Sequence, residues 1–288
     1  PPRSTLFPYT ALFRSGRRLL SLVAPALFLL FWHYASLRIG NPVVLPQIGE
    51  VLSLLLHPTE NLLNMGSLVG NVTVSFVRVF GGYLLAVFVA IPLGLAMGYW
   101  SWLNRMLGLM AGLFRPIPPL SWIPLVLAWF GVASMATILG VEEGAWYPFF
   151  SNIKLSMLFI IFIGAFFPIL VNTIGGVQSV RVTLIDAVRV LGASPWQIVR
   201  YVVLPYAAPQ VFTGLRVGLG VAWMCLVSAE MMPGSISGVG YLITHAYTVA
   251  QTDVVIAGMI AIGVMGILID SIFMLIERRA FQWQSLYR

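Results

Sequence analysis

The sequence predicts an all-α integral membrane protein of about six transmembrane helices. Of its 288 residues, 59% are hydrophobic and 9% are charged, whereas a typical soluble domain has about 25% charged residues. Several charge-poor runs reach the roughly 20 residues that a helix needs to cross a bilayer core of about 30 Å. The ten-residue alternation of hydrophobicity that is typical of a membrane β-barrel is absent from the sequence.

Charge-poor runs define the expected spans in chain order: 19–37, 79–104 with its helix beginning near residue 71, 116–141 with a lead from residue 106, 155–176, 206–229 and 254–276. Arg216 and Asp270 lie inside the last two runs. Backbone polar groups in lipid must bond within their own segment, so all of these spans are expected to be helices.

Basic residues are distributed unevenly between the two sides of the membrane. With the N-terminus inside, two fall on the outer side, Arg38 and Lys154. Eleven fall on the inner side: Arg3, Arg14, Arg17, Arg18, Arg105, Arg181, Arg189, Arg200, Arg278, Arg279 and Arg288. The positive-inside rule therefore predicts that both termini are cytoplasmic. Residues 1–15 are a candidate non-native segment, since they resemble translated sequencing-adapter sequence, and leaving them out does not change the orientation.

The cytoplasmic loop at 177–205 is polar enough to leave the bilayer, yet it has helical periodicity. Its apolar residues at helical spacing are Leu184, Ile185, Val188 and Leu191. Gly192 suits a helix C-terminus. Ser194, Pro195 and Gln197 suit the start of a second helix as N-cap, first-turn proline and capping-box partner. We therefore expect a helix, a turn and a second helix that ends near Pro205, with an exposed apolar edge for a partner.

This loop also resembles the EAA signature of permease subunits in binding-protein-dependent ABC importers. That signature reads EAA, three residues, G, nine residues, I, one residue, LP. The matching positions are Asp186, Ala187, Val188, Gly192, Val202, Leu204 and Pro205. Asp186 stands where Glu is usual, and Val188 where the second Ala is usual. The resemblance implies that this signature, together with Arg189, Ala193 and Pro195, couples the chain to an ATPase subunit; Arg189 is either solvated or an ion-pair partner of that subunit.

Flanking segments extend the resemblance over about 72–282, the expected permease core, to the nitrate, sulfonate, taurine and bicarbonate branch of the family. They include 75–83, 92–98, 115–119, 129–131, 164–173, 192–196, 213–216 and 237–241. Residues 16–71 would form the first helix and an outer amphipathic segment, and 283–288 a cytoplasmic tail. Residues 133–152 are an insertion relative to this branch. By topology the insertion faces outward, where it either alters the docking of a binding protein or is a plain loop extension.

The resemblance implies a type I ABC importer permease fold in a prokaryotic cell membrane. It implies a homodimer with two ATPase subunits and an extracytoplasmic binding protein that delivers a small anion, such as nitrate, bicarbonate, taurine or an alkylsulfonate. The chain itself cannot carry a P-loop, which needs Gly-Lys-Ser/Thr, because its single lysine, Lys154, follows Ile153. ATP and Mg²⁺ are therefore expected on the partner, and no enzymatic activity is expected on this chain.

The remaining composition excludes several other classes of site. One cysteine, Cys225, and three dispersed histidines predict no metal centre and no cofactor on this chain. The scattered arginines predict no nucleic-acid surface.

Three residues are candidates for the substrate pathway: Arg115, Arg216 and Glu230. An arginine within a span costs about 2.5–3.5 kcal/mol on insertion scales, so Arg216 either helps an anion cross or pairs with a carbonyl or an acid of a neighbouring helix. Arg78 and Arg115 lie near span ends, from which their side chains could reach the headgroups. Glu230 either lines an outer gate or is a solvated carboxylate at a helix end, and Asp270 needs no special role.

Three alternatives to an anion-importing permease subunit remain from the sequence. The same machinery could carry a neutral or cationic solute, such as a thiamine-precursor pyrimidine. A stand-alone secondary transporter would show paired broken helices in inverted repeats, which the sequence lacks. A membrane enzyme would need His, Asp or Glu clustered near one face, and no such cluster is visible in the sequence.

Overall fold

The computed structural model describes residues 9–281, with gaps at 132, 142, 145–146 and 233. Its helices in chain order are α1 Tyr9–Ile39, α2 Ile48–Leu56, α3 Leu68–Tyr99, α4 Ser101–Phe114, η1 Pro119–Trp122, α5 Ile123–Phe130, α6 Met135–Leu139, α7 Tyr147–Ser151, α8 Leu155–Gln178, α9 Val182–Val190, α10 Pro195–Ile198, the π-helical turn η2 Val199–Val203, α11 Leu204–Glu230, α12 Val239–Thr248 and α13 Thr252–Ala280. No strand forms in the described part, which confirms the all-α class. The tail at 283–288 and part of the candidate non-native segment lie outside the described residues.

Four helices in the described part are long and apolar enough to cross a membrane: α3, α8, the continuous helix Pro195–Glu230 and α13. A fifth span forms if α4 and the η1–α5 helix count together, although they are bent by 87°. The apolar stretch Val23–Ile39 of α1 is shorter than the others, so the sixth span stays a prediction.

The expected third span is broken rather than straight. Pro116, Pro118 and Pro119 lie together where α4 ends and η1 begins. Proline donates no backbone hydrogen bond, and it disfavours helical geometry in the residue before it. The chain therefore turns here, and α5 ends at Phe130, with Gly131 as its C-cap at a φ of +53°.

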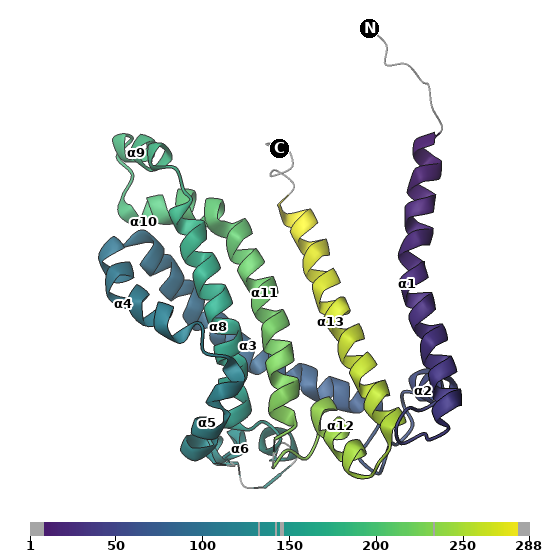
Figure 1. Ribbon diagram of the computed structural model, residues 1–288. Helices are drawn as coiled ribbons and strands as arrows, with labels where there is room; N and C mark the ends of the chain where they lie inside the picture. The colour runs from purple at the N-terminus through teal and green to yellow at the C-terminus, as the bar shows by residue number, and fades with distance from the viewer. Residues whose placement is uncertain (1–8, 132, 142, 145–146, 233, 282–288) are drawn as a thin grey trace.

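Helix α8 lies at the centre of the molecule, between α3 and α11 (Figure 1). Glycines let the backbones approach closely on both sides. A Cβ at Gly82 of α3 would lie 2.7 Å from Ile161 Cβ, and a Cβ at Gly214 of α11 would lie 2.7 Å from Asn172 Cβ. Small residues at such contacts are typical of membrane helices, because packing rather than a hydrophobic driving force holds them together.

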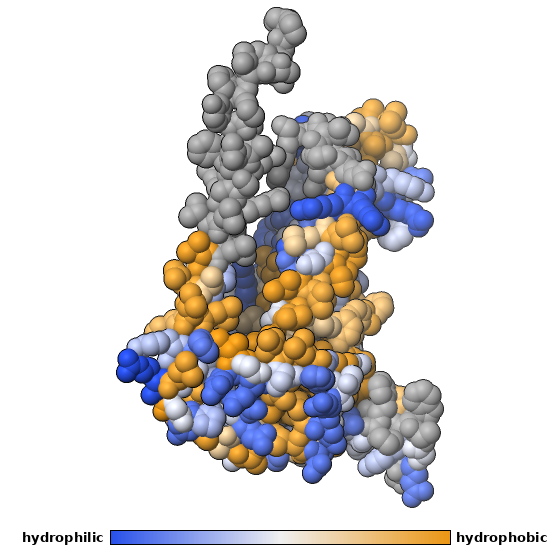
Figure 2. Space-filling model, turned by 90° about the vertical axis from the view of Figure 1, so that its right-hand side faces the viewer, coloured by the Kyte–Doolittle hydropathy of each residue, from blue (hydrophilic) through white to orange (hydrophobic). Residues whose placement is uncertain are grey.

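Helix α13 is far less enclosed than α8. Only 6% of its apolar window is buried, against 50% for α8, and its main contact is with the short helix α12. Figure 2 shows hydrophobic side chains over the middle of one face, between hydrophilic side chains toward the two ends. Helices α9 and α10 lie at one end of the molecule, and α2, α5, α6 and α12 lie at the other (Figure 1).

Gly82→Ala should destabilise the helix packing, because the new methyl group would meet Ile161 Cβ and the carbonyl of Leu158. Overpacking of this kind costs about 1–3 kcal/mol. Thermal unfolding of the purified protein in detergent should show a lower melting temperature for this variant. Gly220→Ala is the matched control, because a Cβ there meets nothing within 4 Å. Equal melting temperatures for the two variants would contradict this account of the packing.

Candidate functional site

The loop after α8 folds into the expected helix, turn and second helix, which we call the elbow (residues 182–198). Gly192 ends α9 with φ at +82°. The Gly192 N–H donates to the Arg189 carbonyl at 3.0 Å, and the Ala193 N–H donates to the Val188 carbonyl at 3.1 Å. This pair of bonds is the Schellman arrangement, in which a residue with positive φ closes the helix.

The start of the second helix also matches its sequence signals. The Ser194 N–H donates to the Gln197 side chain at 2.8 Å, and the Ser194 hydroxyl accepts from the Gln197 N–H at 3.4 Å. The expectation that this helix ends near Pro205 is wrong, since the helix continues to Glu230. The chain instead passes through the π-helical turn η2, where the Leu204 N–H bonds to the Val199 carbonyl. Pro205, which has no N–H, is thus accommodated without ending the helix.

An apolar edge of the elbow is exposed, as expected. The most exposed of its large apolar side chains are Val190 at 87%, Leu191 at 84%, Val182 at 68% and Trp196 at 67%. Val188 faces the other way and packs against the buried ends of α8 and α11. Val188, which stands where the signature usually has the smaller Ala, therefore fills the base of the elbow and does not lie on its exposed edge.

Asp186 and Arg189 pair with each other on the surface of α9. Their ion pair is 2.9 Å long, and the two side chains are 54% and 62% exposed. Such a pair contributes about 0–1 kcal/mol. Both groups remain accessible to a partner.

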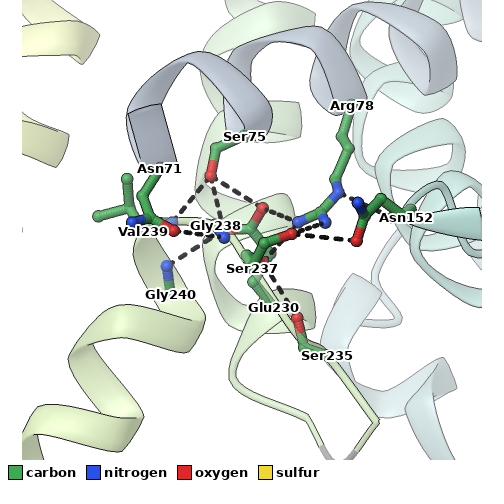
Figure 3. Close-up of polar contacts among 10 residues, drawn as sticks. All are labelled: Asn71, Ser75, Arg78, Asn152, Glu230, Ser235, Ser237, Gly238, Val239 and Gly240. Carbon is green, nitrogen blue, oxygen red and sulfur yellow. Dashed lines mark hydrogen bonds and ion pairs between the residues drawn. The ribbon is translucent and has the colours of Figure 1, made fainter. Parts of the chain in front are cut away.

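A second cluster, which we call the outer network, joins α3, α11 and the start of α12 (Figure 3). At its centre Arg78 Nη1 lies 2.7 Å from Glu230 Oε1, and the two side chains are 3% and 0% exposed. Arg78 therefore does not reach the headgroups, and Glu230 is not a solvated carboxylate. The headgroup location expected for Arg78 and the solvated alternative for Glu230 are therefore wrong, because each residue finds its opposite charge on a helix far away in the sequence.

The outer network supplies the N-terminal caps of α12. Its first N–H groups are bonded by side chains from other helices: Gly238 to Asn71 Oδ1 at 2.9 Å, Val239 to Ser75 Oγ at 3.0 Å and Gly240 to Glu230 Oε2 at 3.1 Å. Helix N-termini leave such donors unsatisfied and favour a nearby negative charge. Gly238, with φ at +108°, leaves room for the carboxylate, which any Cβ there would overlap.

Arg78 also fastens two loops. Its Nη2 donates to Ser237 Oγ at 2.6 Å, and its Nε donates to the Asn152 carbonyl at 3.0 Å. Ser237 Oγ donates in turn to Asn152 Oδ1 at 3.2 Å. Asn152 is the last residue of the segment 133–152, which is the expected insertion, and a bridge between Ser134 and Lys154 joins the chain at the two ends of this segment. Burial and the Arg78 charge lower the pKa of Lys154.

Arg216 is paired within the membrane span, not free. Its Nε and Nη2 lie 2.5 and 2.9 Å from the two carboxylate oxygens of Asp270 on α13, and its Nη1 lies 3.5 Å from Glu277. Of the two alternatives for Arg216, pairing with an acid of a neighbouring helix is therefore the one that the structure shows. Asp270, for which no special role was expected, binds α13 to α11.

Arg115 follows α4 and lines a cavity of about 290 Å³ between the proline-rich turn, α8 and α11. Arg115 is the only charged residue among those that line it; Asn172 of α8 contributes an amide, and the other lining residues are apolar or glycine. The three pathway candidates thus lie in separate surroundings, with Arg115 alone in a cavity. Asn71 and Ser75 were not predicted as members of this network from the sequence, although their spacing to Arg78 places all three on one face of a mostly apolar helix.

Comparisons with known proteins match this architecture. Residues 82–282 match the family described as binding-protein-dependent transport system inner membrane component. A Methanocaldococcus jannaschii protein assigned as an ABC transporter permease is 46% identical over 93% of both chains. The taurine transport system permease protein of Escherichia coli is 32% identical over 90% of this chain and 87% of its own. The bicarbonate transport system permease protein of Synechococcus elongatus is 31% identical over 87% of this chain and 85% of its own.

Among solved structures, a bacterial ABC transporter involved in the import of the acidic polysaccharide alginate covers 95% of this chain and 99% of its own, with a TM-score of 0.55 and 15% identity. That likeness concerns the fold alone.

The buried pair should show strong energetic coupling. Arg78→Ala or Glu230→Ala alone leaves an unpaired buried charge, which costs about 3–5 kcal/mol. The double variant should cost less than the sum of the two, by a coupling of about 0.5–3 kcal/mol, measured as free energies of unfolding in detergent.

The control cycle uses the exposed pair Asp186 and Arg189, for which a coupling below about 1 kcal/mol is expected. Additive effects at Arg78 and Glu230 would show that the ion pair does not hold α3 to α11.

Proposed function

The chain belongs to the family of binding-protein-dependent transport system inner membrane components, as the permease subunit of an ABC importer, and we propose that it forms the pathway for a small anion. The observation that carries the proposal is similarity over nearly the whole chain to permeases for taurine, a zwitterion with an anionic sulfonate group, and for bicarbonate, an anion. A binding protein outside the cell would deliver the substrate. Nitrate and alkylsulfonates carry the same single negative charge as bicarbonate, and they belong to the same proposed class.

The elbow is the proposed contact with a separate ATPase subunit, which would hold the ATP and Mg²⁺. Its exposed Val190, Leu191 and Trp196 would lose water on docking, at about 25 cal/mol per Å² of apolar surface buried. Gly192 of the signature and the neighbouring Ser194 fix the shape of the elbow, through the turn and the helix cap that they form. Closure of the ATPase subunits would then push on α9 and α10 and so change the access of the pathway.

The proposed setting is the inner membrane of a prokaryotic cell, with both termini in the cytoplasm. The elbow lies at the same end of the molecule as the C-terminal end of α13, which carries Arg278 and Arg279 (Figure 1). Basic residues favour the cytoplasmic side. The outer network and the insertion at 133–152 would then lie outside, where the binding protein docks.

The proposed pathway runs past Arg115, and a second copy of this chain would complete it. The cavity beside Arg115 holds one positive charge, no acid among its lining residues and the amide of Asn172. This composition suits a small anion, which a guanidinium binds through paired hydrogen bonds. Arg216 and Glu230 are less suited to the pathway, because their charges are already neutralised by neighbouring helices.

Gly192→Val should weaken ATPase binding, because the turn requires φ near +82° and a β-branched residue is strained there. We expect less ATPase subunit to co-purify with this variant. Gly40→Val is the matched control, because Gly40 also has positive φ with open space around it, but it follows α1 and is far along the chain from the elbow. Asp186→Lys should weaken binding as well. Normal co-purification of Gly192→Val and Asp186→Lys would count against the elbow as the interface.

Arg115→Gln should slow anion uptake, because a hydrogen bond to a charged group contributes about 1.5–3 kcal/mol, and 1.4 kcal/mol corresponds to a factor of about ten. Uptake of radiolabelled taurine, with bicarbonate as a second probe, should fall by about tenfold or more in kcat/KM. Arg105→Gln, on the exposed surface of α4, is the control. Unchanged uptake of a transported anion in Arg115→Gln would remove this residue from the pathway.

A further inference from the structure

We propose that Arg78 and Glu230 are positioning residues that join the outer loops to one continuous helix, so that movement of the elbow reaches the opposite face of the protein. This inference rests on the proposed function, because it takes the elbow to be the site that the ATPase moves. It goes beyond that function by naming the element that carries the movement and the residues that receive it.

The helix Pro195–Glu230 connects the two ends directly. It has 36 residues, which corresponds to a length of about 54 Å at 1.5 Å per residue. Its first turn is the second half of the elbow, capped by Ser194, and its last residue is Glu230 at the centre of the outer network. No loop interrupts it, so a tilt at the elbow displaces the far end as well. The π-helical turn η2 is the one irregular place along it and lies next to the elbow.

Glu230 lies at the C-terminal end of α11, where its negative charge does not stabilise that helix. A negative charge at the C-terminal end of a helix is disfavoured by the helix dipole, and burial of the carboxylate adds a desolvation cost. Both costs are offset from outside α11, by Arg78 and Ser75 of α3 and by the N–H of Gly240 in α12. The carboxylate is therefore explained by what it holds together, the end of α11 and the start of α12.

Arg78 extends this junction to the insertion. Through Ser237 it holds the loop between α11 and α12, and through Asn152 it holds the end of the segment 133–152. Since the Ser134–Lys154 bridge closes that segment at its base, the base of the segment is fixed to the end of α11 through Arg78. The base of the segment 133–152 should therefore move together with the outer end of α11.

The test measures movement at the outer end while nucleotide is changed at the inner end. The chain has a single cysteine, so Cys225→Ser followed by Ile236→Cys leaves one thiol, at a position that is 64% exposed in the α11–α12 loop. In the permease–ATPase complex, the rate of maleimide labelling should change by about fivefold or more with ATP and vanadate, the lower range of typical couplings. ATP and vanadate act on the ATPase subunits and maleimide reacts at the outer loop, so this readout needs neither the substrate nor the binding protein.

Glu230→Gln in this background should make labelling independent of nucleotide, while ATP hydrolysis by the complex continues. Ser237→Ala removes the hydroxyl bonds to Arg78 and Asn152 but keeps the ion pair and the bond from Arg78 to the Ser237 carbonyl, so it should fold and should reduce the response in part. Glu60→Gln is the matched control, a substitution of the same kind at an exposed acid outside the network, and it should keep the full response.

The outcomes separate this inference from the proposed function. A wild-type chain that retains no ATPase subunit would contradict the proposed function. An active complex whose labelling ignores nucleotide, or in which Glu230→Gln or Ser237→Ala keeps the full response, would overturn the inference alone. If Glu230→Gln does not assemble, Ser237→Ala decides.

Discussion

Lipid offers no hydrogen bond to a polar group, and this constraint accounts for where the charges of this protein lie. Within the described spans, Arg78 and Arg216 each meet a carboxylate of another helix. An unpaired charge there would cost several kcal/mol. Each pair therefore does more than cancel charge: one holds α3, α11 and α12 together, and the other holds α13 to α11. The charges determine which helices are neighbours, and the apolar residues then fill the space between them.

Close packing around α8 is the second contribution to the architecture. Glycines on α3 and α11 bring both backbones against α8, so α8 has little freedom to move relative to them. By contrast α13 is held mainly by α12 and by the Arg216–Asp270 pair. The protein thus has a rigid three-helix centre and a loosely held helix beside it, and α11 is the element of that centre that continues directly into the elbow.

Local signals predicted the parts of the structure that depend on local interactions. The all-α class followed from composition, and the turn at Gly192 and the cap at Ser194 followed from residues within a few positions of each other. The prediction at Pro205 was wrong, because a proline can be absorbed by a π-helical turn when tertiary contacts maintain the helix. The partners of Arg78 and Glu230 could not be predicted, because they are set by the packing of helices whose contacting residues lie 152 positions apart. The helical spacing of Asn71, Ser75 and Arg78 was the one local signal of that network.

The separation of Arg78 and Glu230 in the sequence affects the order in which the protein assembles during its synthesis. Arg78 is synthesised 152 residues before Glu230, which at about 5–20 residues per second is a delay of roughly 8–30 s. During this time α3 has left the ribosome with a guanidinium that lacks its final partner. The N-terminus of α12 also depends on α3 and α11 for its caps. Membrane insertion of this chain therefore has an order of assembly: α12 can settle only after α11 has arrived, and Arg78 must be sheltered at the membrane surface or by the insertion machinery until then.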